Sequence, residues 1–165
     1  MADNEINPYE KLEELKEILK DYNVTVHTCG DENEEYSYLE EGSYCVTANN
    51  SSGDELFIDW DGEFTLTYDA WHAHFSGCKA EYKEMLEYLA DIFNGKYWVC
   101  SIYCNGQWKG SSLLENAVKS KEEARQHIKS YYDKKFIAQM KSDGVEVHYV
   151  CWNESNIIKF EPGEL

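Results

Sequence analysis

The chain has 165 residues, of which 42% are hydrophobic and 15% aromatic, and this composition excludes an intrinsically disordered or low-complexity protein. Its 32 acidic residues outnumber its 15 lysines and arginines, and the net charge of −17 argues against binding to nucleic acid or anionic lipid. The chain lacks an apolar run long enough to span a membrane and a basic start followed by an apolar segment, so we expect one cytoplasmic domain over residues 1–165.

The first element in chain order is an amphipathic helix that begins after Asn7. Asn7 is a favourable N-cap residue, Pro8 suits the first turn, and Glu10 stands at the capping-box position. The apolar stripe of this helix consists of Leu12, Leu15, Leu19 and Tyr22. The helix is therefore expected to end near Tyr22, and strands are expected at 23–29 and 43–48.

Residues 55–68, ELFIDWDGEFTLTY, predict a hairpin whose register depends on the length of its turn. A two-residue turn at Asp61 and Gly62 would place the apolar residues of the first strand opposite polar residues of the second. A three-residue connection from Asp61 to Glu63 instead aligns two apolar sets, which are Leu56, Ile58 and Trp60 with Phe64, Leu66 and Tyr68. Burial of both sets favours the longer connection.

In the next stretch, DAWHAHF, the sequence leaves open which side chains point to which face of the sheet, that is, the parity of the strand. If the second strand continued straight through Asp69, His72 and His74 would point inward while Trp71 and Phe75 pointed outward. Either the sheet is covered on both faces there, or a bulge or turn at Asp69-Ala70 reverses the parity. We favour the reversal, which buries the two aromatic rings and exposes both histidines.

The second half of the chain predicts further helices and strands. We expect a helix over 79–94 that ends at Gly95, strands at 96–104 and 107–114 around an Asn105-Gly106 turn, and strands at 145–152 and 157–160. Ser120 and Glu123 form a capping box that opens another helix, expected to continue through at least Tyr132, with Met140 as the alternative end. The pattern predicts an α+β fold, a mostly antiparallel sheet of about six to eight short strands with about three helices packed on it.

Six cysteines are spread through the chain at positions 29, 45, 78, 100, 104 and 151. A chain of this size does not need disulfides for stability, and nothing marks it for export, so we expect reduced thiols. Cys100 and Cys104 fall on one face of one predicted strand, too far apart for a disulfide.

The histidines and cysteines offer two kinds of chemistry. His72, His74 and Cys78 could supply three ligands of a zinc site with a fourth from elsewhere, and zinc is the one cofactor that the sequence suggests. The competing interpretation is that the histidines are hydrogen-bonded structure and that Cys78 only begins a helix. A cysteine nucleophile paired with a histidine, from His27 with Cys29 or from His148 with Cys151, is a weaker alternative, because buried thiols are common in reduced sheets.

The stretch EFTLTYDAWHAHF, residues 63–75, resembles a group of small bacterial proteins in which a similar strand is followed by W-H-x-H-aromatic. The later hairpin YCNGQWKGSSLL is similar as well. The function of that group is unknown, so the resemblance implies only a bacterial, cytoplasmic protein. Small acidic toxin-immunity proteins are also similar in size, charge and aromatic content.

The acidic surplus lies in the N-terminal part of the chain, where residues 1–63 contain 18 acidic residues against three lysines. We therefore expect a non-catalytic protein that binds a basic partner, in the manner of an immunity-like inhibitor. The predicted partner-binding residues are Glu34, Glu35, Tyr36, Tyr38 and Tyr44. Two alternatives remain: acidic residues that serve solubility with tyrosines in the core, and a small metal-dependent enzyme that uses His72 and His74.

Overall fold

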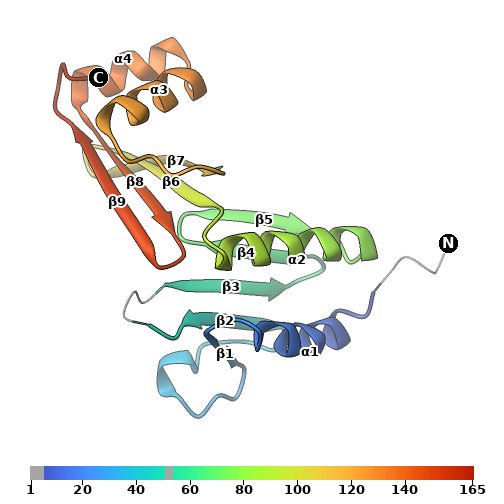
Figure 1. The fold of residues 1–165 in the computed structure, drawn as a ribbon. Coiled ribbons are helices and arrows are strands. Elements are labelled where there is room, and N and C mark those ends of the chain that lie inside the picture. The colour runs from blue at the N-terminus through green and yellow to red at the C-terminus, as the bar shows by residue number, and fades with distance from the viewer. Residues whose placement is uncertain (1–5, 51–53) are drawn as a thin grey trace. The chain divides into compact units, whose positions relative to one another are not determined.

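The computed structural model describes residues 6–50 and 54–165 of the chain. The sequence predicts one domain over residues 1–165, and the contacts within that span cluster into two compact units, Met1–Asn94 and Gly95–Leu165. Each unit pairs one antiparallel sheet with two α-helices (Figure 1).

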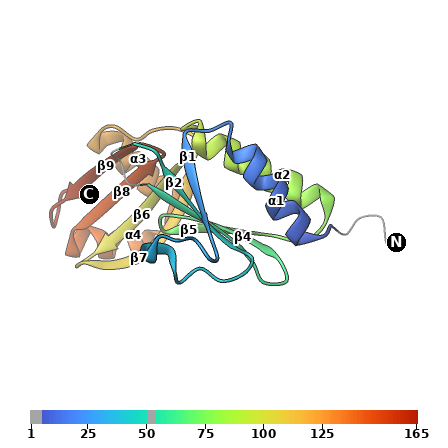
Figure 2. The same cartoon turned by 90° about the horizontal axis from the view of Figure 1, so that it is seen from below.

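Unit 1 is a five-stranded meander with a helix at each end of its chain segment. Its elements are α1 (Pro8–Leu19), β1 (Val24–Thr28), the 3-10 helix η2 (Glu34–Tyr36), β2 (Ser43–Ala48), β3 (Glu55–Trp60), β4 (Phe64–Tyr68), β5 (Trp71–Phe75) and α2 (Lys79–Phe93). The strands pair in the order β1-β2-β3-β4-β5, each antiparallel to its neighbour. Both helices lie along the same face of this sheet (Figure 2), which we call the inner face.

The helices of unit 1 form where capping and periodicity predict them. The side chain of Asn7 accepts a hydrogen bond from the backbone N–H of Tyr9 at 3.1 Å, which satisfies one orphan donor of α1. Leu12, Leu15 and Leu19 are buried as predicted. In α2 the buried stripe is Tyr82, Met85, Leu89 and Ile92.

The hairpin of β3 and β4 has the predicted three-residue connection. Leu56 pairs with Tyr68, Ile58 with Leu66, and Trp60 with Phe64. Leu56, Ile58, Phe64 and Leu66 are fully buried on the inner face. Burial of both apolar sets therefore set the register, as the sequence indicates.

The reversal of parity after β4 is also confirmed. Asp69 has φ 51°, a left-handed conformation, and with Ala70 it forms a tight turn into the separate strand β5. In that strand Trp71 pairs with Tyr68 and Phe75 with Phe64, so both rings lie on the inner face. His72 and His74 alternate with them and are exposed on the opposite, outer face.

Unit 2 has a four-stranded antiparallel sheet with two helices inserted between its hairpins. Its elements are β6 (Trp98–Cys104), β7 (Gln107–Leu114), α3 (Lys121–Tyr131), α4 (Lys134–Asp143), β8 (Val145–Cys151) and β9 (Glu154–Phe160), and the strand order is β7-β6-β8-β9. Asn105 (φ 52°) and Gly106 (φ 72°) make the predicted two-residue turn, with Tyr103 opposite Trp108. The strand expected at 157–160 begins earlier, at Glu154, because it pairs with β8 along its whole length.

The helix predicted from Ser120 through at least Tyr132 is two helices. The capping box of Ser120 and Glu123 is present, but α3 ends at Tyr131 because Tyr132 is extended, with φ −105° and ψ 151°. Asp133 then caps α4, since its carboxylate accepts hydrogen bonds from the backbone N–H groups of Lys135 at 2.8 Å and Phe136 at 2.9 Å. Asp133 therefore accepts hydrogen bonds from backbone N–H groups and divides the segment into two helices, although its apolar periodicity alone predicts one continuous helix.

The observed fold is α+β with antiparallel pairing, as predicted, but the predicted counts need correction. Residues 6–50 and 54–165 contain nine strands, divided between two sheets, and four α-helices. Local pairing signals predict hairpins well, whereas the grouping of hairpins into sheets depends on contacts distant in sequence. Over the same residues, no helix is both long and apolar enough to cross a bilayer.

The cap of α4 gives a direct test of the divided helix. Asp133→Ala should lower the free energy of unfolding by about 1 kcal/mol, because two backbone N–H groups lose their acceptor. Lys134→Ala, at the neighbouring exposed position, is the control and should change stability by less than about 0.5 kcal/mol. Urea denaturation measures both, and equal effects of the two substitutions would contradict the capping role.

Candidate functional site

The two histidines of β5 lie on the outer face and are held by local contacts. Nδ1 of His74 is 2.8 Å from a carboxylate oxygen of Glu63 and 3.2 Å from the hydroxyl of Thr65. The ring centroids of His72 and His74 are 5.2 Å apart, edge to face. The pair therefore forms a polar strip at the edge of the sheet, with a carboxylate that orients one imidazole.

Cys78, the third predicted zinc ligand, is the N-cap residue of α2. Its Sγ accepts a hydrogen bond from the Ser76 hydroxyl at 3.4 Å, and this bond together with the backbone N–H of Glu81 lowers the pKa of the thiol. Among residues 6–50 and 54–165, no three His, Cys, Asp or Glu side chains are grouped so that they could hold a metal ion. Zinc binding by the predicted ligands stays a prediction.

The predicted partner-binding residues divide into exposed and buried groups. Glu34 and Glu35 are exposed on η2, and Tyr38 just after it is 59% exposed. Tyr36 and Tyr44 are buried, at 7% and 5% exposure. Among the three tyrosines, Tyr38 is therefore the one that presents its ring to a partner.

The 31–41 segment, which contains η2, is anchored to the outer face of the sheet. The ring of Tyr36 stacks on His27 with centroids 3.7 Å apart, and His27 is hydrogen-bonded to Asp31 at 3.0 Å and Thr47 at 3.1 Å. Tyr36 and Leu39 form a small buried cluster with Cys45 of β2. Two buried side chains thus hold a segment that is otherwise exposed and acidic.

Positive charge is absent from a long stretch of unit 1. Residues 21–78, which we call the acidic segment, contain 13 acidic residues and neither lysine nor arginine. Ten of those acidic residues are exposed and three are half-buried. Unit 1 as a whole contains 23 acidic residues against five lysines, whereas unit 2 contains nine against ten lysines and arginines.

The lysines that unit 1 does contain are largely paired within their own helices. Lys11, Lys16 and Lys20 pair with glutamates one turn away on α1, and Lys83 pairs with Glu87 on α2. Within the acidic segment, the ion pairs of Asp31 and Glu63 are with histidines. The sheet and its loops therefore carry a large excess of negative charge.

A hollow of about 300 Å³ lies where α1 meets the ends of β1 and β2. We call it the tyrosine hollow, and its principal walls are Tyr9, Leu12, Glu13, Lys16, Glu41 and Tyr44. The Lys16 ammonium lies 5.2 Å from the ring centroid of Tyr44 and 2.6 Å from a carboxylate oxygen of Glu13. Tyr44, which the sequence suggests as a contact residue, therefore forms a wall of this hollow.

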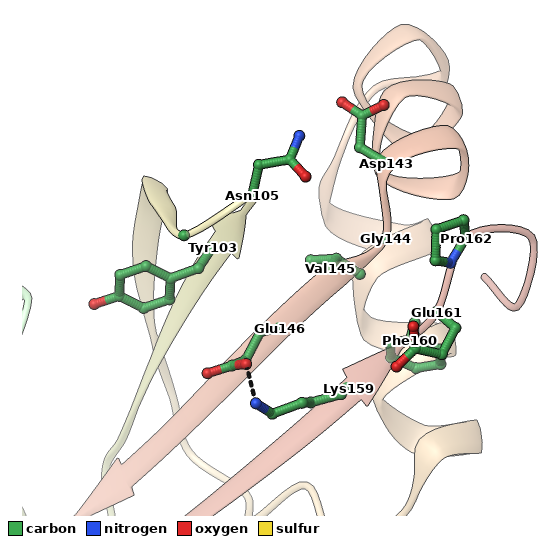
Figure 3. A pocket seen from close by; sticks show the side chains of 11 residues that line it. Tyr103, Asn105, Asp143, Gly144, Val145, Glu146, Lys159, Phe160, Glu161 and Pro162 are labelled. Atoms are coloured by element: carbon green, nitrogen blue, oxygen red, sulfur yellow. Dashed lines mark ion pairs between the residues drawn. The ribbon is translucent and has the colours of Figure 1, made fainter.

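Unit 2 has a hollow of its own, of about 220 Å³, beside the start of β8. Figure 3 shows Glu146 and Lys159 joined by an ion pair in this hollow, with Asp143 and Glu161 on other sides. Hydrogen bonds from Lys159 and His148 lower the pKa of Glu146. Because its central carboxylate is already paired with Lys159 and hydrogen-bonded to His148, this hollow is a weaker candidate for binding a cation.

The core of unit 2 contains a polar cluster that sequence reasoning missed. Cys100 of β6 lies between its strand partners Ser112 and Tyr149, and Nδ1 of His127 on α3 is 3.9 Å from its Sγ. Among the described residues, Nε2 of His127 is buried without a hydrogen-bond partner.

The position of Cys100 in that cluster argues against a nucleophilic role. Burial raises the pKa of the Cys100 thiol to about 12, so this thiol is protonated at neutral pH. In the pairs that the sequence offered, Cys29 is exposed at the end of β1, and Cys151 lies in the core while His148 points to the other face of β8. No local pattern could have paired Cys100 with His127, because 27 residues separate them and helix packing brings them together.

No protein-family model, curated protein or solved structure matches this chain.

The buried imidazole of unit 2 predicts a specific pH dependence. Burial lowers the pKa of His127, so the folded state binds fewer protons than the unfolded state once the pH falls below the ordinary value of 6.5. Stability should therefore be unaffected by this group above that value and should decrease below it, by at most about 1.4 kcal/mol per pH unit.

Urea denaturation of the wild type and of His127→Gln between pH 7.5 and 5.5 measures this effect. The wild type should lose more stability than the variant over that range. Parallel pH profiles for the wild type and His127→Gln would show that His127 is not responsible.

Proposed function

We propose that this protein is a non-catalytic binding module that recognises a basic protein, in the manner of an immunity-like inhibitor. One observation supports this proposal above the others: the acidic segment contains 13 carboxylates, none of them buried, and no lysine or arginine. Solubility alone requires a net charge but does not require both signs to be segregated so completely, since mixed surfaces are equally soluble. The same potential disfavours nucleic acid as a ligand.

The 31–41 segment is the proposed centre of the interface. Asp31 and Asn33 accept hydrogen bonds from backbone N–H groups two residues ahead, each at 3.1 Å, and so hold the turns that lead into η2. With Tyr36 buried beneath them, Glu34, Glu35 and Tyr38 are displayed on an ordered backbone. Binding there would lose less conformational entropy than binding by a flexible acidic tail.

We further propose that the protein works in a reducing bacterial cytoplasm. All six cysteines fall within the described residues, and each is a free thiol there. Four of them, Cys45, Cys100, Cys104 and Cys151, are buried as small apolar side chains. Buried free cysteines of this kind are usual in compartments where thiols are kept reduced.

Charge reversal within the 31–41 segment tests the proposed interface. Glu34→Lys with Glu35→Lys should slow association with a basic partner isolated from the native cell by about tenfold or more, because carboxylates steer the encounter. The rate for the wild type should fall steeply as the Debye length shortens to about 8 Å near physiological salt. Stopped-flow measurement at several salt concentrations gives both results.

The matched control for this test is Glu84→Lys with Glu87→Lys on α2, which makes the same change in net charge on the other side of the sheet. It should slow association far less, while both double variants retain their stability because exposed charges contribute under about 1 kcal/mol each. If purification at low salt recovers no basic protein in stoichiometric amount, the binding proposal fails.

The proposed reducing environment predicts the state of the thiols. In freshly lysed native cells, all six cysteines should react with a thiol reagent under denaturing, non-reducing conditions. Mass spectrometry counts the labelled positions. Labelling of two or fewer would contradict the cytoplasmic proposal.

A further inference from the structure

The tyrosine hollow combines three features that together recognise a cation with an apolar stem. Its lining includes two buried side chains with apolar surface, Leu12 and Tyr44, which are 2% and 5% exposed. Tyr9, at the rim, is 51% exposed and presents an aromatic ring without a role in the core. Glu13 and Glu41 place carboxylates in the lining, and both are exposed.

The chain itself shows how a cation lies against this lining. The ammonium of Lys16 lies over the Tyr44 ring at 5.2 Å and bonds to Glu13 at 2.6 Å, while its alkyl stem is half-buried. The hydroxyl of Tyr44 donates to the same Glu13 carboxylate at 3.5 Å. Through hydrogen bonding, Lys16 lowers the pKa of Glu13, which keeps that carboxylate charged.

Glu41, in the same lining, has no such cationic partner: over residues 6–50 and 54–165, no cationic side chain forms an ion pair with it. The volume of about 300 Å³ is at the lower limit for sites that enclose a drug-sized ligand, about 300 to 1,000 Å³, so one side chain is the better match.

We propose that the tyrosine hollow receives an arginine side chain of the basic partner, an inference that rests on the proposed binding function and names its anchor. A guanidinium is planar and has five N–H donors, so it can stack on the ring of Tyr9 while donating to the carboxylate of Glu41. A lysine ammonium lacks the planar face and binds there more weakly. An arginine in an aromatic-lined, partly desolvated hollow is a usual hot-spot arrangement in interfaces.

The position of Lys16 makes the proposal testable by a gain of affinity. Lys16 places a positive charge in the lining of the hollow and pairs with Glu13, so Lys16→Gln, which removes that charge and releases Glu13, should tighten binding of an arginine peptide by about fivefold. Lys20→Gln is the matched control, because it removes the same charge one turn further along α1, outside the hollow. It should change the affinity by less than about twofold.

Loss of affinity is tested by a second matched pair. Glu41→Gln should weaken binding by about fivefold, whereas Glu40→Gln, which makes the same charge change at the adjacent exposed residue outside the hollow, should weaken it by less than about twofold. Tyr9→Ala and Tyr131→Ala form the corresponding aromatic pair. Both remove exposed tyrosine rings, and only the first lines the hollow.

The probe is the peptide acetyl-(Gly-Arg)4-amide, compared by titration calorimetry with its lysine and citrulline counterparts and followed by NMR of the full chain. The arginine peptide should bind most tightly, and the amide signals of Gly42 and Ser43, which line the hollow, should shift most. Absence of arginine-peptide binding to the wild type would overturn the hollow as an anchor.

Two further outcomes would also overturn the proposal. Equal effects of Glu40→Gln and Glu41→Gln would show that the general negative field binds the peptide, which leaves the binding module proposal intact but removes the hollow from it. The chain could instead form a dimer in the absence of peptide. If Glu41→Gln abolished that dimer, the hollow would be assigned to binding a second copy of the chain. The binding module proposal itself is judged separately, by the 31–41 charge reversal.

Discussion

The alternation of side chains along β3, β4 and β5 is the constraint on which unit 1 depends. A slip of one residue would turn Ile58 and Leu66 outward and bring Phe57 and the threonines of β4 against the helices. Two short connections prevent such a slip: the three residues from Asp61 to Glu63, and the turn in which Asp69 adopts a positive φ. The inner face is consequently apolar enough for α1 and α2 to pack on it, and the histidines of β5 stay outside.

The distribution of charge follows from that packing. Because the inner face receives the apolar half of each strand, the carboxylates of the acidic segment are left on the outer face and in the loops. The 31–41 segment would be a solvated acidic loop if Tyr36 did not stack on His27 and Leu39 did not reach Cys45. Those contacts convert a charge excess into a surface of defined shape, which a partner can recognise specifically rather than only through a long-range field.

The two units contain ionisable groups in opposite settings. In the tyrosine hollow, Glu13, Lys16 and Tyr44 meet at the surface, where water and partners reach them. In unit 2, Cys100, His127 and Tyr149 meet beneath α3, where burial keeps the thiol protonated and disfavours the imidazolium. Recognition therefore belongs to the exposed groups, whereas the buried ones link the stability of the fold to pH.

The sequence by itself determined what depends on neighbouring residues. Asn7 and Ser120 start helices, Asn105-Gly106 forms its turn, and the choice between two and three residues at Asp61 follows from comparing two local apolar patterns. The division at Asp133 was within reach too, since an aspartate three residues before Phe136 is a cap signal, but uninterrupted apolar periodicity outweighed it.

Only the tertiary structure decided which of these elements meet. It separated the hairpins into two sheets, buried Tyr36 and Tyr44 while leaving Tyr38 exposed, and joined α1 to the ends of β1 and β2 to make a hollow. It also placed His127 against Cys100 across 27 residues of sequence. Such contacts depend on which amphipathic helices and sheets pack against each other. The apolar stripe of one helix could pack on many apolar surfaces, and only the complete core selects one of them.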